Sequence, residues 1–114
     1  MREHKYRAWD KKYKKMYYGD IRIVLAYPHK DIVRMEYTGL KAKNGEIYEG
    51  DVVAINGGAN PIKTEVFFED GCYCVKMLDN TCELKYYTEM QFCETEIIGN
   101  IYENPELLPK PGKE

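Results

Sequence analysis

The chain has 114 residues, of which 44% are hydrophobic and 32% charged, and its formal net charge at pH 7 is −2. This length suits one domain that needs no metal or disulfide to form a core, and the composition is that of a globular rather than a disordered protein. No apolar run approaches the roughly 18 residues that cross a bilayer. The polar N-terminus predicts a cytoplasmic protein without a signal peptide.

The charges are distributed unevenly along the chain. Residues 1–18 carry seven Lys or Arg against two acidic residues, a balance of +5. Residues 65–106 carry two Lys against ten carboxylates, a balance of −8. We therefore expect a basic N-terminal segment next to an acidic body.

The first predicted element is a β-hairpin over residues 4–18. Its strands, in KYRAWD and KMYY, alternate in polarity and flank the polar loop DKKYKK. Residues 21–27 (IRIVLAY) predict a third strand that Pro28 ends, because proline cannot donate to a strand ladder. Residues 30–37 (KDIVRMEY) fit either a strand or a short helical turn, and they are the one segment that we consider compatible with helix.

Turn signals organise the middle of the chain. Asn44-Gly45 predicts a tight turn, since both residues tolerate a positive φ, and residues 47–48 follow as a brief strand. Gly50 allows a bulge or a sharp change of direction before the next strand, at residues 51–55.

The remaining chain consists of short predicted strands separated by turns. The strands are predicted at residues 63–69, 72–78, 83–90 and 95–103, and the turns at 56–61, Asp70-Gly71 and 78–81. Residues 104–114 are rich in proline and glycine and predict an extended tail. The pattern favours an all-β fold with at most one short helix: an N-terminal β-hairpin segment (1–37), an SH3-like barrel (38–103) and the tail.

Three stretches together resemble one protein family. KYRAWDKKYKKMYY (5–18), YTGLKAKNGEIYEGDVV (37–53) and EIIGNIYENPELL (96–108) are similar to stretches of the YopX-like proteins, in the same order. Those proteins are encoded by phages and prophages, chiefly of Gram-positive bacteria. The resemblance implies an SH3-like barrel with an N-terminal β segment. It supplies no catalytic residues, because the family has no assigned function, and Cys72 and Cys74 depart from its pattern.

The sequence offers little for catalysis or metal binding. It contains no serine, so a serine nucleophile is excluded, and His4 and His29 lie in polar segments apart from the cysteines. Cys72 and Cys74 are separated by one residue inside a predicted strand, whereas zinc knuckles place about two to four residues between paired ligands. We predict a protein that is not an enzyme, binds no metal or cofactor, and uses its cysteines as structural thiols.

The basic segment is the candidate binding site. It interleaves cations that suit phosphates with rings that suit bases, as proteins that bind single-stranded nucleic acid do, although a pI of about 5.8 is low for such a protein. The alternatives are a hairpin whose rings pack on the barrel and a contact between subunits. The residues are Lys5, Tyr6, Arg7, Trp9, Lys11, Lys12, Tyr13, Lys14, Lys15 and Tyr17.

These observations together predict a non-enzymatic binding module. The basic segment and the acidic body are complementary, and contacts between them in different chains would join subunits head to tail. We expect a homo-oligomer that binds a host or phage macromolecule in the bacterial cytoplasm and has no membrane partner. The alternative is a nucleic-acid-binding accessory protein that uses the basic aromatic segment.

Overall fold

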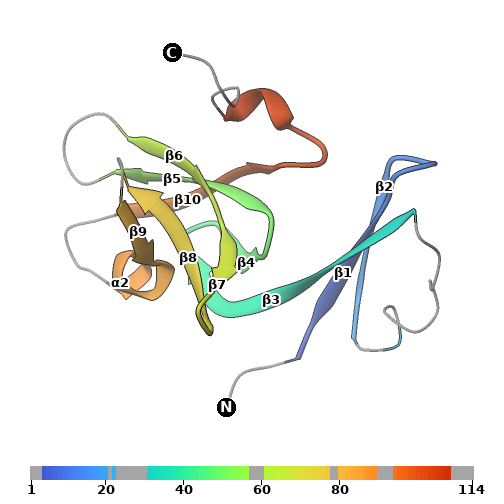
Figure 1. The fold of residues 1–114 in the computed structure, drawn as a ribbon, viewed down its shortest axis with the longest axis horizontal. Coiled ribbons are helices and arrows are strands. Elements are labelled where there is room, and N and C mark those ends of the chain that lie inside the picture. Colours follow the sequence, from blue (N-terminus) through green and yellow to red (C-terminus); the bar gives the residue numbers. More distant parts are fainter. Residues whose placement is uncertain are drawn as a thin grey trace.

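A computed structural model describes residues 4–20, 22, 31–56, 61–77, 80–89 and 94–108. The strands are β1 (Tyr6–Asp10), β2 (Lys15–Gly19), β3 (Ile32–Ala42), β4 (Gly45–Tyr48), β5 (Asp51–Asn56), β6 (Ile62–Glu65), β7 (Phe67–Glu69), β8 (Cys72–Met77), β9 (Asn80–Glu83) and β10 (Glu94–Asn100). The helix α2 (Leu84–Glu89) and the 3₁₀ helix η1 (Pro105–Leu107) complete the described elements (Figure 1).

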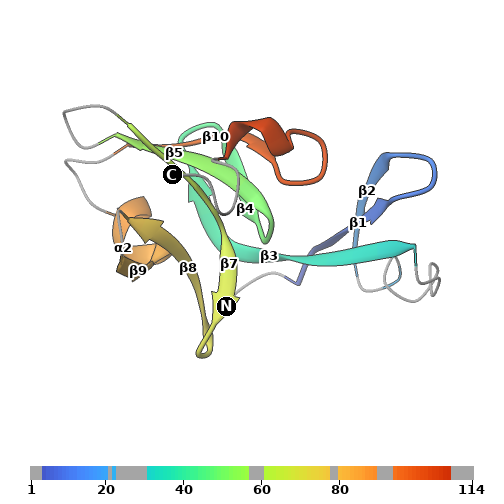
Figure 2. The same cartoon turned by 45° about the horizontal axis from the view of Figure 1, so that its top comes forward.

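The strands form three antiparallel sheets, in the orders β2-β1-β3-β4, β10-β5-β6 and β7-β8-β9. The long strand β3 connects the two parts of the molecule, because its first half pairs with β1 and its second half with β4. The β1–β2 hairpin lies to one side of a body in which the other strands curl around a core (Figures 1 and 2). The fold is therefore all-β and barrel-like, as the sequence predicts.

The N-terminal hairpin is confirmed, with Trp9 opposite Met16 and Asp10 opposite Lys15. Residues 32–37 are strand, so the helical alternative for this segment is wrong at the residues that the structure describes. The physical reason is that β1 is a central strand and needs a partner on both edges, which β2 and β3 provide. The domain boundary predicted after residue 37 falls inside β3 and stays a prediction.

An apolar core fills the curled body. Its buried members are Ile47, Val53, Ile55, Val66, Tyr73, Val75 and Leu84. The predicted turn at Asn44-Gly45 joins β3 to β4, and the one at Asp70-Gly71 joins β7 to β8. Gly50 has a φ of +89°, and a Cβ there would lie 3.0 Å from Met35 Sδ, so glycine is needed where the chain turns into β5.

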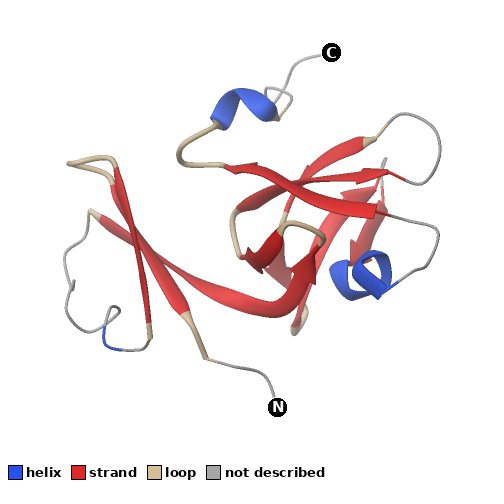
Figure 3. Ribbon diagram, turned by 180° about the vertical axis from the view of Figure 1, so that it is seen from behind, coloured by secondary structure: helices blue, strands red, loops and turns tan. Residues whose placement is uncertain are grey.

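Two predicted strands differ from the structure in the body. The strand expected at 63–69 is divided at Val66 into β6 and β7. The Val66 N–H still donates to the Asp51 carbonyl of β5, and the residues after it pair with β8 instead. The strand expected at 83–90 is the helix α2 from Leu84 to Glu89 (Figure 3). A helical turn places Leu84 in the core and lets Tyr87, three residues later, pack against the same core.

The C-terminal segment also differs from expectation. The strand predicted at 95–103 ends at Asn100, and residues 101–103 form a turn. Residues 105–107 are the 3₁₀ helix η1 rather than an extended tail. A Cβ on Gly99 would lie 2.6 Å from Asn104 Oδ1, so glycine at 99 lets this segment fold back on β10. The predicted strand at 21–27, apart from Arg22, and most of the predicted loop at 56–61 lie outside the described residues.

Candidate functional site

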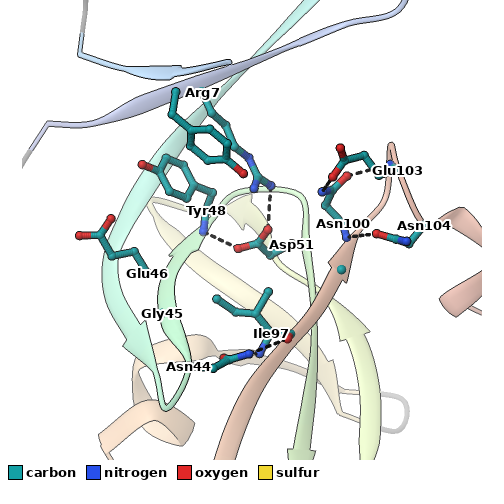
Figure 4. A pocket seen from close by; sticks show the side chains of 12 residues that line it. Arg7, Asn44, Gly45, Glu46, Tyr48, Asp51, Ile97, Asn100, Glu103 and Asn104 are labelled. Carbon is teal, nitrogen blue, oxygen red and sulfur yellow. Dashed lines mark hydrogen bonds and ion pairs between the residues drawn. The ribbon is translucent and has the colours of Figure 1, made fainter. Parts of the chain in front are cut away.

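A buried ion pair joins the hairpin to the body. The Arg7 Nη2 of β1 lies 2.8 Å from Asp51 Oδ1 at the start of β5, and each side chain is 3% exposed (Figure 4). The same nitrogen donates to the Glu49 carbonyl at 3.1 Å, and the guanidinium lies over the Tyr48 ring at 4.9 Å. The Tyr48 N–H donates to Asp51 Oδ2 at 2.7 Å. Arg7 therefore attaches the hairpin to the body.

Burial governs the electrostatics of this pair. It raises the pKa of Asp51, and the Arg7 charge and the Tyr48 N–H act in the opposite direction. The Arg7 Nε is buried and has no hydrogen-bond partner among the described residues. Because both charges are away from water, removing either partner leaves the other unpaired in a poorly solvated place.

An inner cleft of about 490 Å³ lies beside the ion pair, between the hairpin and β10 (Figure 4). Its lining is polar, but its groups are engaged with one another. Asn44 bonds through both its amide nitrogen and its amide oxygen to the backbone of Ile97, and the Asn100 amide donates to Glu103 Oε1 at 2.8 Å. These contacts hold the wall of the cleft in place.

An outer cleft of about 640 Å³ lies between the hairpin turn and the chain that follows β10. It is lined by Trp9, Lys11, Lys14, Ile101, Tyr102 and Glu103. The Trp9 and Tyr102 rings are stacked with centroids 6.1 Å apart. The N–H groups of Tyr102 and Glu103 both donate to Asn100 Oδ1, which fixes the far wall.

The hairpin turn is an ordered loop that displays cations. Asp10 Oδ1 accepts the N–H groups of Lys12 and Tyr13, and the Asp10 carbonyl accepts the N–H of Lys14 at 2.7 Å. Lys14 has a φ of +56°, in the left-handed region that side chains other than glycine and asparagine seldom adopt. We call residues 11–15 the cationic turn, and all five are exposed.

The predicted site residues are divided among different environments. Arg7 and Trp9 are buried between the hairpin and the body, and Trp9 also lines the outer cleft. Lys5 forms an ion pair with Glu46 and lies 5.4 Å from the Tyr37 ring centroid. Tyr6 and Tyr17 are half-buried on the opposite face of the hairpin from Arg7. The structure brings together the remaining five at the cationic turn: Lys11, Lys12, Tyr13, Lys14 and Lys15.

Sequence reasoning missed the partners of these residues. Asp51, Tyr102 and Glu103 are far from the hairpin in sequence and reach it only through the fold. The sequence offered one indication that Asp51 has a partner. Asp51 follows Gly50 and begins an apolar strand, and an acidic residue is seldom buried without a partner. Tyr102 and Glu103 carried none.

The cysteines form a separate group in the body. The Sγ atoms of Cys72 and Cys74 are 3.6 Å apart on β8. Burial, and then the neighbouring Cys72 thiol, raise the pKa of Cys74 to about 11, so this thiol is protonated at neutral pH and is a poor nucleophile. Among the described residues no three His, Cys, Asp or Glu side chains are grouped to hold a metal ion. Cys93 and His29 lie outside those residues.

No helix in the described part of the chain is long and apolar enough to span a membrane. The solved structures with a similar fold include the following two. The protein yopX of Bacillus subtilis is 21% identical, with a TM-score of 0.67, over 96% of this chain and 100% of that one. The protein EF1440 of Enterococcus faecalis is 25% identical, with a TM-score of 0.68, over the same shares of the two chains.

Comparison of the sequence with protein families places it more closely. No curated protein matches the chain. The model of the YopX protein family matches residues 20–109. This range begins just after the hairpin and includes both the body and the segment that folds back on β10. The chain therefore belongs to the YopX family.

Proposed function

We propose that the protein is a phage- or prophage-encoded, non-enzymatic binding module of the bacterial cytoplasm, which self-assembles and acts on a host or phage macromolecule. The observation that carries this proposal is the cationic turn. Its four lysines are exposed and have no ion-pair partner among the described residues, while the chain that follows the hairpin is acidic. Tyr13, 66% exposed, adds apolar area to the same turn.

The position of these charges supports self-assembly. The Arg7–Asp51 pair and the Trp9–Tyr102 stack attach the hairpin to the body. They thereby fix the position of the cationic turn, which follows the last residue of β1. The exposed carboxylates of the body include Glu69, Asp70, Glu83, Glu89, Glu96 and Glu106. A turn that meets these groups on a second copy forms a contact between two different surfaces. Repetition of such a contact builds a ring where the rotation closes and an open filament where it does not.

The test compares two variants with the same change of charge. Lys12→Glu with Lys15→Glu reverses the two lysines of the turn that do not line the outer cleft. Lys63→Glu with Lys85→Glu makes the same change at exposed positions on the body. Light scattering after size exclusion should find an oligomer for the unchanged protein and the body variant, and a smaller species for the turn variant. A monomer for the unchanged protein, or equal masses for the two variants, contradicts the proposal.

Nucleic-acid binding is the second candidate function, and the same cationic turn favours it. Lysines grouped with an exposed ring suit the backbone and bases of a single strand. Fluorescence anisotropy with a labelled single-stranded oligonucleotide tests it, since a phosphate contact weakens steeply as salt increases. Binding by the unchanged protein, lost in the turn variant and kept in the body variant, would make this the better assignment.

A further inference from the structure

The outer cleft combines two unpaired cations with an apolar wall. Lys11 and Lys14 line it from the hairpin turn, and neither has an ion-pair partner among the described residues. Ile101 and Tyr102 face them from the chain after β10, both half-buried. One carboxylate, Glu103, also lines the cleft, so the cations outnumber the anion there.

Backbone contacts position both lysines. The Lys11 N–H donates to the Asp31 carbonyl at 2.9 Å, and the Lys14 N–H donates to the Asp10 carbonyl at 2.7 Å. The left-handed φ of +56° at Lys14 is a strained conformation for lysine, and glycine or asparagine would adopt it more easily. Strain of this kind is found at ligand sites, where the side chain is needed for its chemistry rather than for its backbone preference.

We propose that the outer cleft binds a nucleotide, with Lys11 and Lys14 on its phosphate and Ile101 and Tyr102 against its base. A terminal phosphate carries close to two negative charges at neutral pH and so matches two ammonium groups better than a single carboxylate does. The Glu103 carboxylate is oriented by the Asn100 amide, and it can accept a hydrogen bond from a sugar hydroxyl or a base amine. The ligand is a free mononucleotide or the phosphorylated end of a single strand.

The site and the proposed subunit contact share the cationic turn but can be tested through different lysines, because only Lys11 and Lys14 line the outer cleft. Lys12 and Lys15 do not line the outer cleft, and Lys15 lies opposite Asp10 on the hairpin face away from Trp9. Variants at these two pairs of lysines therefore separate nucleotide binding from self-assembly.

The only tryptophan of the chain provides the signal, because Trp9 lines the cleft. The full-length protein is titrated with AMP, adenosine and inorganic phosphate, and binding is followed by Trp9 emission and by calorimetry. We expect AMP to bind more tightly than either of its parts. Decathymidylates with and without a 5′-phosphate then distinguish the end of a strand from the free mononucleotide. No heat and no change in emission with either AMP or the 5′-phosphorylated strand would overturn the proposal.

The variants Lys14→Asn and Lys12→Asn form the matched pair. Lys14→Asn removes a charge-assisted hydrogen bond to phosphate and should weaken binding by about tenfold or more. Because asparagine tolerates a left-handed backbone, this variant should melt at the same temperature as the unchanged protein or higher. Lys12→Asn should bind AMP unchanged. Equal affinities for the two variants contradict the proposal, whatever their state of assembly.

Discussion

The hairpin and the curled body are stabilised by different means. The body encloses a continuous apolar core. Among the described residues, the hairpin is attached to it by the shared strand β3, by the buried Arg7–Asp51 pair, and by ring contacts of Trp9 with Tyr102 and of Tyr18 with Tyr48. An apolar core is stabilised by many contacts of similar strength, whereas a buried ion pair depends on both of its members. The hairpin is therefore expected to be the part whose attachment a single substitution can lose.

The largest expected effect is at the ion pair. Arg7→Met leaves Asp51 buried without its partner and should lower the free energy of unfolding by roughly 3–5 kcal/mol, as when one member of a buried pair is removed. Adding Asp51→Asn removes the orphaned charge and should restore part of the loss. Urea denaturation measures both variants. If the double variant is less stable than Arg7→Met, the ion pair does not hold the hairpin as described.

A core substitution in the body should have a comparable or somewhat smaller effect. Leu84 is fully buried at the start of α2, and Leu84→Ala should cost about 2–5 kcal/mol through lost burial and the cavity left behind. Tyr86→Ala on the same helix serves as the control, because Tyr86 is 59% exposed. Thermal unfolding should show a much lower melting temperature for Leu84→Ala than for Tyr86→Ala. An equal decrease in melting temperature for the two variants would mean that α2 does not close the core through Leu84.

The smallest expected effect concerns the carboxylates of Glu49 and Glu65 in the body. Burial raises the pKa of Glu65, and the Glu49 charge adds to it; burial also raises the pKa of Glu49. A carboxyl with a folded-state pKa above its unfolded value holds its proton more tightly in the folded protein. Its contribution to stability therefore increases as the pH falls from neutral toward the ordinary range for glutamate.

Glu65→Gln tests this pH dependence. The variant should be slightly more stable at pH 7, by less than about 1 kcal/mol for a partly exposed group, and should gain less on mild acidification. Glu96→Gln, on the exposed side of β10, should change neither quantity. If the stability of the unchanged protein and of Glu65→Gln depends on pH in the same way, Glu65 is not responsible for the gain in stability on mild acidification.

Local chemistry made part of this structure predictable from sequence. The hairpin and the turns at Asn44-Gly45 and Asp70-Gly71 depend on neighbouring residues, and they are correct. The helix α2 was missed because the core position of Leu84 determines it, not the alternation of its sequence. The division at Val66 was missed because strands distant in sequence, β5 and β8, compete for the same segment.

The candidate site was predictable only in part for the same reason. The sequence marks the basic aromatic segment but does not tell which face of the hairpin meets the body. Arg7 and Trp9 lie on the face toward Asp51 and Tyr102, which are distant in sequence and cannot be matched to them beforehand. The exposed cationic turn is what remains for binding, and this is a narrower site than the whole segment.

Sedimentation of mixtures tests the central claim, that the cationic turn of one copy binds the body of another, most directly. The variant Lys12→Glu with Lys15→Glu lacks the turn contact but keeps the acidic body. Added in excess, it should therefore cap the unchanged protein and reduce the size of its assemblies in proportion to the amount added. The body variant Lys63→Glu with Lys85→Glu should join the assemblies without shortening them. Assemblies that keep their size whatever the excess of turn variant would contradict the account.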